Sequence, residues 1–129
     1  MRYLLLLYDA DMGREPTPEE LQSSLARYGA FTADVRSRGL FQAGEALQPI
    51  ESATTVRVRN GRTMVTDGPF AETKEFLSGF YLLDCRDLDE AIELAGRIPA
   101  AEAGSIEIRP IWELPPEYAT AIAAGARAG

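Results

Sequence analysis

The stretch that most restricts the fold is "TTVRVRNGRTMVT", residues 54–66. Asn60 and Gly61 separate two arms that are rich in β-branched residues, and an Asn-Gly pair in this setting predicts a type I′ turn in a two-residue hairpin. Val56 and Val58 would then face one way, and the intervening arginines the other. On either side of this hairpin, the order of the predicted elements gives two strand-helix-strand halves.

The first half predicts a strand, a helix and a strand. "RYLLLLY" (2–8) is too short for an ordinary helix and ends in a polar loop. Thr17, Pro18 and Glu20 form a helix start with a capping box, and an apolar arc at helical spacing continues to Gly39. "LFQAGEAL" (40–47) follows as a strand, with Gly44 at a bend or bulge.

The second half repeats this order. "GFYLLDC" (79–85) predicts a strand, and Asp87 begins a helical pattern that Pro99 closes. "SIEIRPIW" (105–112) is the last strand, where Pro110 favours a sheet edge or a bulge. We expect one domain over residues 1–114 and an Ala-rich tail, 115–129, that forms a weak helix or frays.

The order β-α-β, hairpin, β-α-β predicts an α+β, ferredoxin-like fold with two helices on one face of a mainly antiparallel sheet. In "YLLLLY" and "FYLLDC" both alternating faces are apolar, yet two helices can cover only one face. A second copy of the chain is the simplest cover for the other face. We therefore expect a homodimer with a barrel-like interface.

Composition and charge exclude several classes of function. With a net charge of -7, direct binding to nucleic acid or to an anionic membrane is disfavoured. The apolar start of the chain is too short for a signal peptide or a membrane span, so we expect a cytoplasmic protein. The single cysteine, Cys85, lies in an apolar strand and is expected in the core; the chain contains no histidine to activate it.

The segment "VTDGPFAETKEFLSG" (65–79) is the main candidate for a functional site. An aspartate in a turn usually accepts a hydrogen bond from the N–H two residues on, but here that residue is Pro69, so the Asp67 carboxylate is freer than most to meet a ligand. The link from Asp67 to Ser78 reads as a long loop, in which 69–75 could form one helical turn. Such loops are often functional.

Two interpretations of this segment remain open. In the first, Asp67 is an acid/base or ligand-orienting carboxylate, Lys74 binds an anion and Phe70 is the wall of an apolar pocket. In the second, Asp67 and Lys74 pair with each other or with arginines of the hairpin and merely fix a corner. A hard-cation site from Asp67, Glu72 and Glu75 is the weakest possibility, and no metal or cofactor is expected.

Other polar and aromatic residues are secondary candidates. Asp9 and Asp11 could reach the same pocket or lie in a solvated loop. Arg109 could bind an acidic ligand or pair with a neighbouring glutamate. The aromatic residues that could line a cavity are equally consistent with core or dimer contacts; they are Tyr8, Tyr81 and Trp112.

The motif "DGPFAETKE", preceded by "TTVRVRNGRTMV" and followed by "GFYLL" and "SIEIRPIWE", resembles the YCII-related superfamily, specifically its DGPF-domain branch. The resemblance covers about residues 1–114 and implies a dimeric α+β barrel. It also implies that the function is mostly uncharacterised: some members of the wider superfamily carry a His-Asp pair suggested to be catalytic, and some are dehalogenases or lactone-related enzymes that act on aromatic breakdown products. The positions of that pair correspond to Tyr28 and Ile98 here.

The resemblance leaves three functions to consider. The first is a homodimer with a small-molecule pocket near the DGPF loop. The second is an enzyme acting on a small aromatic or lactone-like compound with Asp67 as acid/base. The third is an interaction module that works with an extracytoplasmic-function sigma factor, because DGPF proteins resemble modules found beside such factors.

Overall fold

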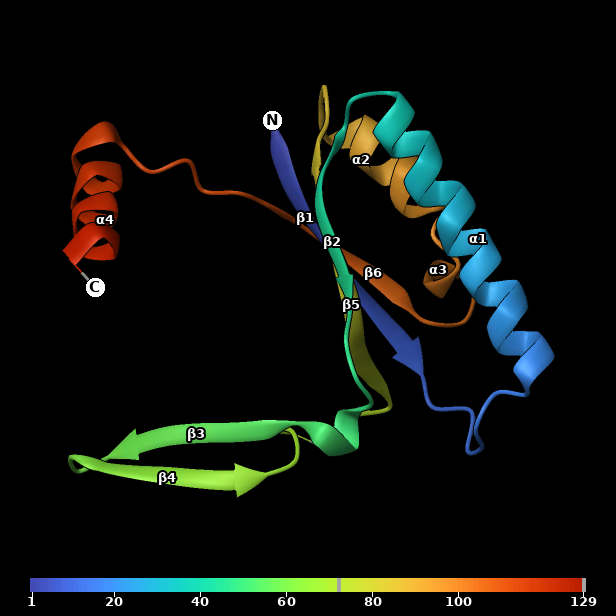
Figure 1. The fold of residues 1–129 in the computed structure, drawn as a ribbon, viewed down its shortest axis with the longest axis horizontal. Helices are drawn as coiled ribbons and strands as arrows, with labels where there is room; N and C mark the ends of the chain where they lie inside the picture. Colours follow the sequence, from blue (N-terminus) through green and yellow to red (C-terminus); the bar gives the residue numbers. More distant parts are fainter. Residues whose placement is uncertain (72, 129) are drawn as a thin grey trace.

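The computed structural model describes residues 1–71 and 73–128. Four strands form one antiparallel sheet in the order β2-β5-β1-β6, and two further strands form a separate hairpin. Figure 1 shows the first three helices on one side of the sheet, and the hairpin and the C-terminal helix extending on the other side. The elements are β1 (Arg2–Ala10), α1 (Pro18–Ser37), β2 (Phe41–Ala46), a 3₁₀ turn (Ile50–Ser52), β3 (Thr54–Arg59), β4 (Arg62–Asp67), β5 (Glu75–Asp84), α2 (Leu88–Ala95), α3 (Ala100–Ala103), β6 (Ser105–Pro110) and α4 (Pro116–Ala128).

This arrangement confirms the predicted α+β, ferredoxin-like fold. Helix α1 begins as the capping box requires, because the Thr17 side chain accepts from the Glu20 N–H at 3.1 Å and Glu20 accepts from the Thr17 N–H at 2.9 Å. The hairpin turns through Asn60 and Gly61, whose φ angles are 53° and 73°. Strand β6 lies at a sheet edge, as Pro110 predicts.

The core lies between the sheet and helices α1–α3. Strand β1 sends alternate side chains into it, and strand β5 does the same. Cys85 is also buried there, as expected. The buried hydrophobic residues are Tyr3, Leu5, Leu7, Phe31, Val35, Tyr81, Leu83, Cys85, Ala91, Leu94, Ala95, Ile98 and Ala100.

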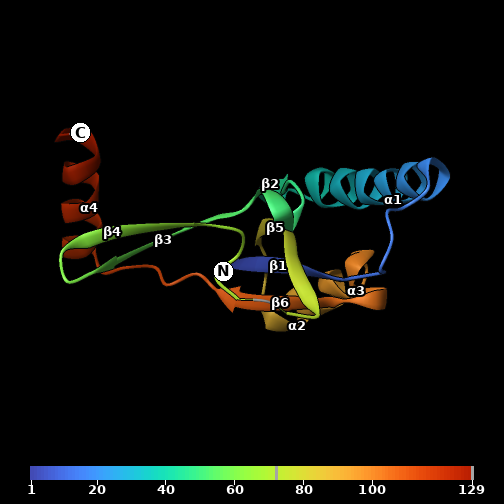
Figure 2. The same ribbon diagram turned by 90° about the horizontal axis from the view of Figure 1, so that it is seen from below.

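The opposite face of the sheet has no cover among the residues the structure describes. Leu4 pairs with Leu82 and Leu6 with Phe80, so these four apolar side chains lie together on that face, and they are only half-buried. Figure 2 shows the hairpin and helix α4 on the same side of the molecule, separated from the helices by the sheet. Apolar residues on both faces of the central strands are thus found as predicted.

Three expectations about local structure were wrong. Strand β5 begins at Glu75, because residues 75–77 continue the pairing with Ala10, Asp9 and Tyr8 of β1; the link after Asp67 is therefore 68–74 rather than a loop reaching Ser78. Residues 69–71 and 73–74 form no helical turn, and Glu72 lies outside the described residues. The second predicted helix ends earlier than expected, because α2 stops at Ala95, and a short helix that was not predicted, α3, follows Pro99. No helix of the described ranges is long and apolar enough to cross a membrane.

Candidate functional site

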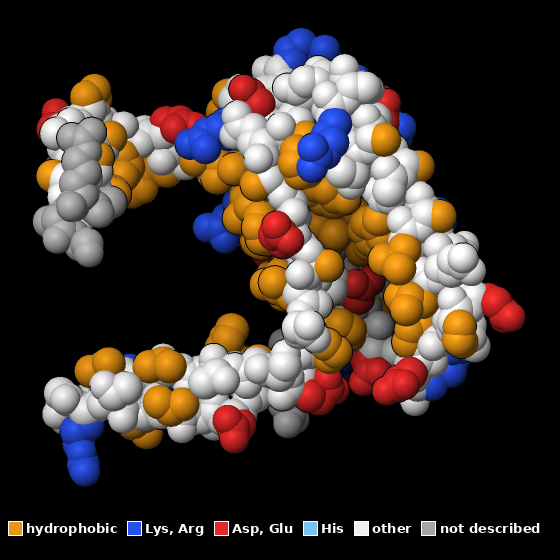
Figure 3. All heavy atoms as spheres, in the orientation of Figure 1, with side chains coloured by type: hydrophobic (Ala, Val, Ile, Leu, Met, Phe, Trp, Pro, Cys, Tyr) orange, Lys and Arg blue, Asp and Glu red, His pale blue; other side chains and the backbone are white. Residues whose placement is uncertain are grey.

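A cleft of about 380 Å³ lies between helix α1 and strands β1, β2 and β5. Figure 3 shows hydrophobic side chains along the hollow between α1 and the sheet. The volume falls within the range of pockets that hold small organic molecules. Its lining includes Asp9, Leu21, Leu25, Tyr28, Thr32, Arg36, Phe41, Gly44, Glu45 and Tyr81.

One face of helix α1 forms the wall of this cleft. Leu21, Leu25, Tyr28, Thr32 and Arg36 follow one another at steps of four, three, four and four residues, which keeps them on one side of a helix. The two leucines remain 50% and 62% exposed. The apolar part of the wall is thus open to a ligand, and the polar part lies further along the helix.

The floor of the cleft is built around Tyr81. Its hydroxyl lies 2.8 Å from the Thr32 hydroxyl, and its ring meets those of Phe31 and Phe41 edge to face at 5.0 and 6.3 Å. A Cβ at Gly44 would lie 2.9 Å from the Tyr81 ring, so glycine is needed on β2 for the ring to fit. The floor is therefore an ordered aromatic surface.

The polar groups of the cleft are of mixed charge. Asp9 and Glu45 supply carboxylates, and the Arg36 guanidinium lies 4.2 Å from the centre of the Phe41 ring. Burial, and then the negative charge of Asp9, raise the pKa of Tyr28 to about 12. Near neutral pH the Tyr28 phenol is protonated, as an ordinary tyrosine also is, so it can donate a hydrogen bond and does not act as a base.

A second hollow, of about 590 Å³, lies at the end of strand β1 and is more open. Lys74 lines it together with Asp11 and Glu75. The Asp11 carboxylate accepts the Gly13 N–H at 2.8 Å, and the Glu75 carboxylate accepts the Ser105 hydroxyl at 2.7 Å. Because both carboxylates already have structural partners, and the hollow encloses a ligand less well, we regard the α1–sheet cleft as the better site.

The corner that contains Asp67 is fixed mainly by its backbone. Gly68 has a φ of 101°, a conformation that favours glycine, and its N–H donates to the Ala53 carbonyl at 2.6 Å. The Gly68 carbonyl accepts the Thr55 hydroxyl at 2.8 Å, and the Phe70 carbonyl accepts from Arg57 at 3.5 Å. Within the described parts of the chain, no ion pair joins Asp67 to Lys74 or to a hairpin arginine.

The residues predicted from the sequence do not come together in a single chain. Tyr81 lies in the cleft, Lys74 in the open hollow, and Phe70, 77% exposed, near Asp67 at the base of the hairpin. Tyr8 is half-buried near the end of β1. Arg109, on the edge strand β6, pairs with Glu107 at 3.2 Å, which is the alternative that the sequence left open.

Sequence reasoning missed Thr32 and Arg36, and it did not weigh Tyr28 as a ligand contact. The signal was present, because Tyr28, Thr32 and Arg36 are spaced four residues apart and so extend the apolar arc of α1 as a polar stripe. Asp9 and Asp11 were considered as candidates for the same pocket, but Asp9 lines the α1–sheet cleft and Asp11 lines the open hollow.

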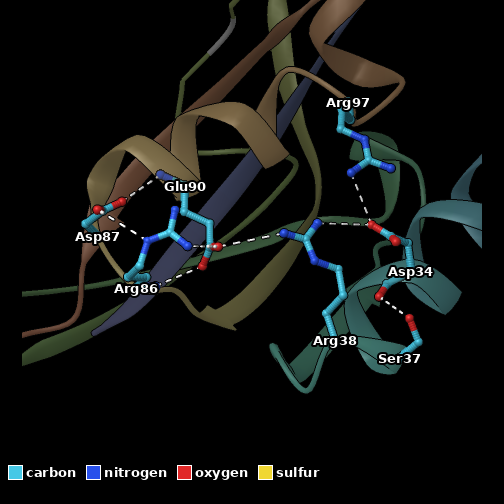
Figure 4. A network of polar contacts seen from close by, with 7 residues as sticks. All are labelled: Asp34, Ser37, Arg38, Arg86, Asp87, Glu90 and Arg97. Atoms are coloured by element: carbon cyan, nitrogen blue, oxygen red, sulfur yellow. Dashed lines mark hydrogen bonds and ion pairs between the residues drawn. The ribbon is translucent and has the colours of Figure 1, made fainter.

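Among the described residues, Glu90 has the most buried carboxylate, and it belongs to a structural network rather than to a site. It accepts the Arg86 backbone N–H at 2.9 Å and pairs with the Arg86 and Arg38 side chains at 3.3 and 3.7 Å (Figure 4). Arg38 and Arg97 both reach Asp34, on helix α1. These contacts hold the end of α1 against the start of α2. Among residues 1–71 and 73–128, no three acidic or cysteine side chains are grouped to hold a metal ion.

The profile of the YCII-related domain matches residues 1–115, nearly the whole chain. The chain belongs to this family. An uncharacterised protein of Rhizobium meliloti (strain 1021), R00369, is 52% identical over 114 residues, which cover 86% of this chain and 92% of that protein. The family assignment confirms the resemblance seen in the sequence, while membership of the DGPF branch stays a prediction.

Among solved structures, the chain is similar to TftG, the 5-chloro-2-hydroxyhydroquinone dehydrochlorinase of Burkholderia phenoliruptrix AC1100, in complex with 2,5-dihydroxybenzoquinone. The identity is 16% and the TM-score 0.48, over 91% of this chain and 98% of that one. This likeness is too distant to assign a ligand or a reaction.

Proposed function

We propose that this protein is a cytoplasmic homodimer that binds a small, largely apolar molecule in the cleft between helix α1 and the sheet. The observation that carries the proposal is the cleft itself, of about 380 Å³, with an aromatic floor and a wall from one helix face. Apolar lining with a few convergent polar groups is typical of small-molecule sites.

The polar groups indicate the chemistry of the ligand. A protonated Tyr28 donates a hydrogen bond, so a carbonyl or hydroxyl oxygen is a suitable acceptor. The exposed side chains of Leu21 and Leu25 lose contact with water when a planar apolar body lies against them. A neutral aromatic alcohol, ketone or lactone combines both features.

Ligand-observed NMR with a panel of phenols, aromatic ketones and lactones tests this proposal. Ser24 lies on the cleft side of α1, so Ser24→Trp should fill the cleft and abolish binding. Ser23→Trp, on the exposed side of the same helix, is the matched control and should bind as the wild type does. Binding that survives Ser24→Trp would place the ligand elsewhere.

The homodimer is supported by the open face of the sheet. Leu4, Leu6, Phe80 and Leu82 form an apolar surface there, and an identical surface on a second copy would cover it through a two-fold axis. Sedimentation equilibrium at micromolar concentration tests this, and a monomer throughout the range would contradict it.

The site around Asp67 is a second candidate, either as part of a ligand pocket with Phe70 and Lys74 or as the acid/base of an enzyme. It is supported by the exposed position of Asp67 at the end of β4 and by a corner whose hydrogen bonds come from the backbone and Thr55. Loss of turnover in Asp67→Asn, with the fold intact, would favour the enzyme.

Partnership with a sigma factor rests on the family resemblance alone. Pull-down from a native lysate, followed by identification of a sigma factor that binds the purified chain directly, is the test.

A further inference from the structure

We propose that the hairpin β3–β4 and helix α4 are two arms that clasp a second copy of this chain. This inference rests on the proposed homodimer and adds the segments that hold it together. Both arms extend on the open side of the sheet, and a wide space lies between them (Figures 1 and 3).

The exposed area of the chain favours such a partner. A compact monomer of this mass exposes roughly 6,700 Å², whereas this chain exposes 9417 Å². The excess of about 2,700 Å² is well above the ~800 Å² that each partner of a standard interface buries. The open face and the two arms together therefore provide enough area for a stable dimer.

Neither arm is expected to be stable without other parts of a protein packed against it. A two-stranded hairpin without a covering layer is at best marginal in water, and so is an isolated helix as short as α4, which has 13 residues. In the register of the hairpin, Val56 lies opposite Val65 on one face, and these side chains are 59% and 64% exposed. On α4, Tyr118 and Ile122 share one face and are 57% and 61% exposed.

Charge favours a second copy as the occupant. Within residues 54–66 the only charged side chains are the three arginines Arg57, Arg59 and Arg62. Because the whole chain carries -7, the rest of it carries -10. A basic arm held away from its own acidic body is attracted to the acidic body of another copy.

Three full-length variants test the clasp by the dimer dissociation constant, measured by sedimentation equilibrium. Val56→Thr with Val65→Thr keeps the shape and β propensity of the hairpin, and Tyr118→Gln with Ile122→Gln keeps the helix propensity of α4. We expect each pair to weaken the dimer at least tenfold. The control is Thr120→Gln with Ala124→Gln, a pair that lies on another face of α4, and it should change the constant less than twofold.

A photo-crosslinking residue at position 118 tests the geometry. In a mixture of ¹⁴N- and ¹⁵N-labelled protein, we expect mixed-isotope peptides, which arise only between two copies.

The outcomes separate this inference from the proposed dimer. If the wild type is monomeric, both fail. If both arm variants dimerise as the wild type does, the sheet-face dimer stands and the clasp is overturned. Crosslinks found only within one chain would also overturn it.

Discussion

The two faces of the four-stranded sheet differ in how much of each is covered by the rest of the chain. On the helix side, Leu5 and Leu83 have no exposed area, and an ion-pair network joins α1 to α2. On the other side, Leu4 and Leu82, their neighbours in sequence, are half-buried beneath open space flanked by two arms. The same strand therefore packs one face into a closed core and leaves its other face uncovered. Whether a side chain is buried depends on which face of the sheet it points to, and this alternates from one residue to the next.

The largest expected effect separates these faces directly. Leu83→Ala should lower the free energy of unfolding by about 2–5 kcal/mol, because it leaves a cavity in the closed core. Leu82→Ala should cost less than half of that, since its side chain is not enclosed within one chain. Urea unfolding at low protein concentration measures both; equal losses would mean that the two faces are equally closed.

The ion-pair network on the helix side gives the next largest effect. Glu90→Ala removes the acceptor of the Arg86 N–H and a carboxylate that is 8% exposed, so we expect a loss of about 1–3 kcal/mol. Glu93→Ala, an exposed change on the same helix, should stay within about 0.5 kcal/mol. Thermal unfolding compares the stability of the two variants. Similar losses would show that the network does not contribute measurably to stability.

The base of the hairpin tests the open side. Gly68→Ala meets no atom within 4 Å, but its φ of 101° makes alanine strained by about 1–3 kcal/mol. Because the hairpin is separate from the main sheet, hydrogen exchange should accelerate in residues 54–67 and not in β1 or β5.

Gly29→Ala is the matched control for Gly68→Ala. It also meets no atom within 4 Å, but it lies inside helix α1, where alanine is favoured, and it should stabilise by up to about 1 kcal/mol. Faster exchange throughout the core of Gly68→Ala would show that hairpin and core unfold together.

The fold was largely predictable because its signals are local. Asn60-Gly61 specifies the hairpin turn, and Thr17 with Glu20 specifies the helix start, without help from distant residues. The start of β5 was missed because Glu75 resembles a loop residue; it is in a strand because it pairs with Ala10, far away in the sequence. Such pairings override local propensity.

The candidate site was less predictable, because it depends on which elements meet. The DGPF segment was predicted as a site because of its unusual sequence. In the structure, Gly68 of this segment lies at a corner and has a positive φ. Tyr28, by contrast, looks like one more apolar position of a helix. Its polar role follows only from its position near Asp9 of strand β1.

The smallest effect on stability is expected inside the cleft, where Tyr28 titrates late. Burial and Asp9 raise its folded pKa to about 12, so an ultraviolet titration of the protein should include a late ionisation step of Tyr28 near that pH. An unfolded tyrosine ionises near pH 10, so the contribution of Tyr28 to stability is complete below about pH 10 and is lost as the pH rises toward 12. Tyr28→Phe should remove the late step and leave stability at neutral pH nearly unchanged. Asp9→Asn should move the step to lower pH. If the step does not move, Asp9 and Tyr28 do not interact, and they cannot be treated as a pair at the polar end of the cleft.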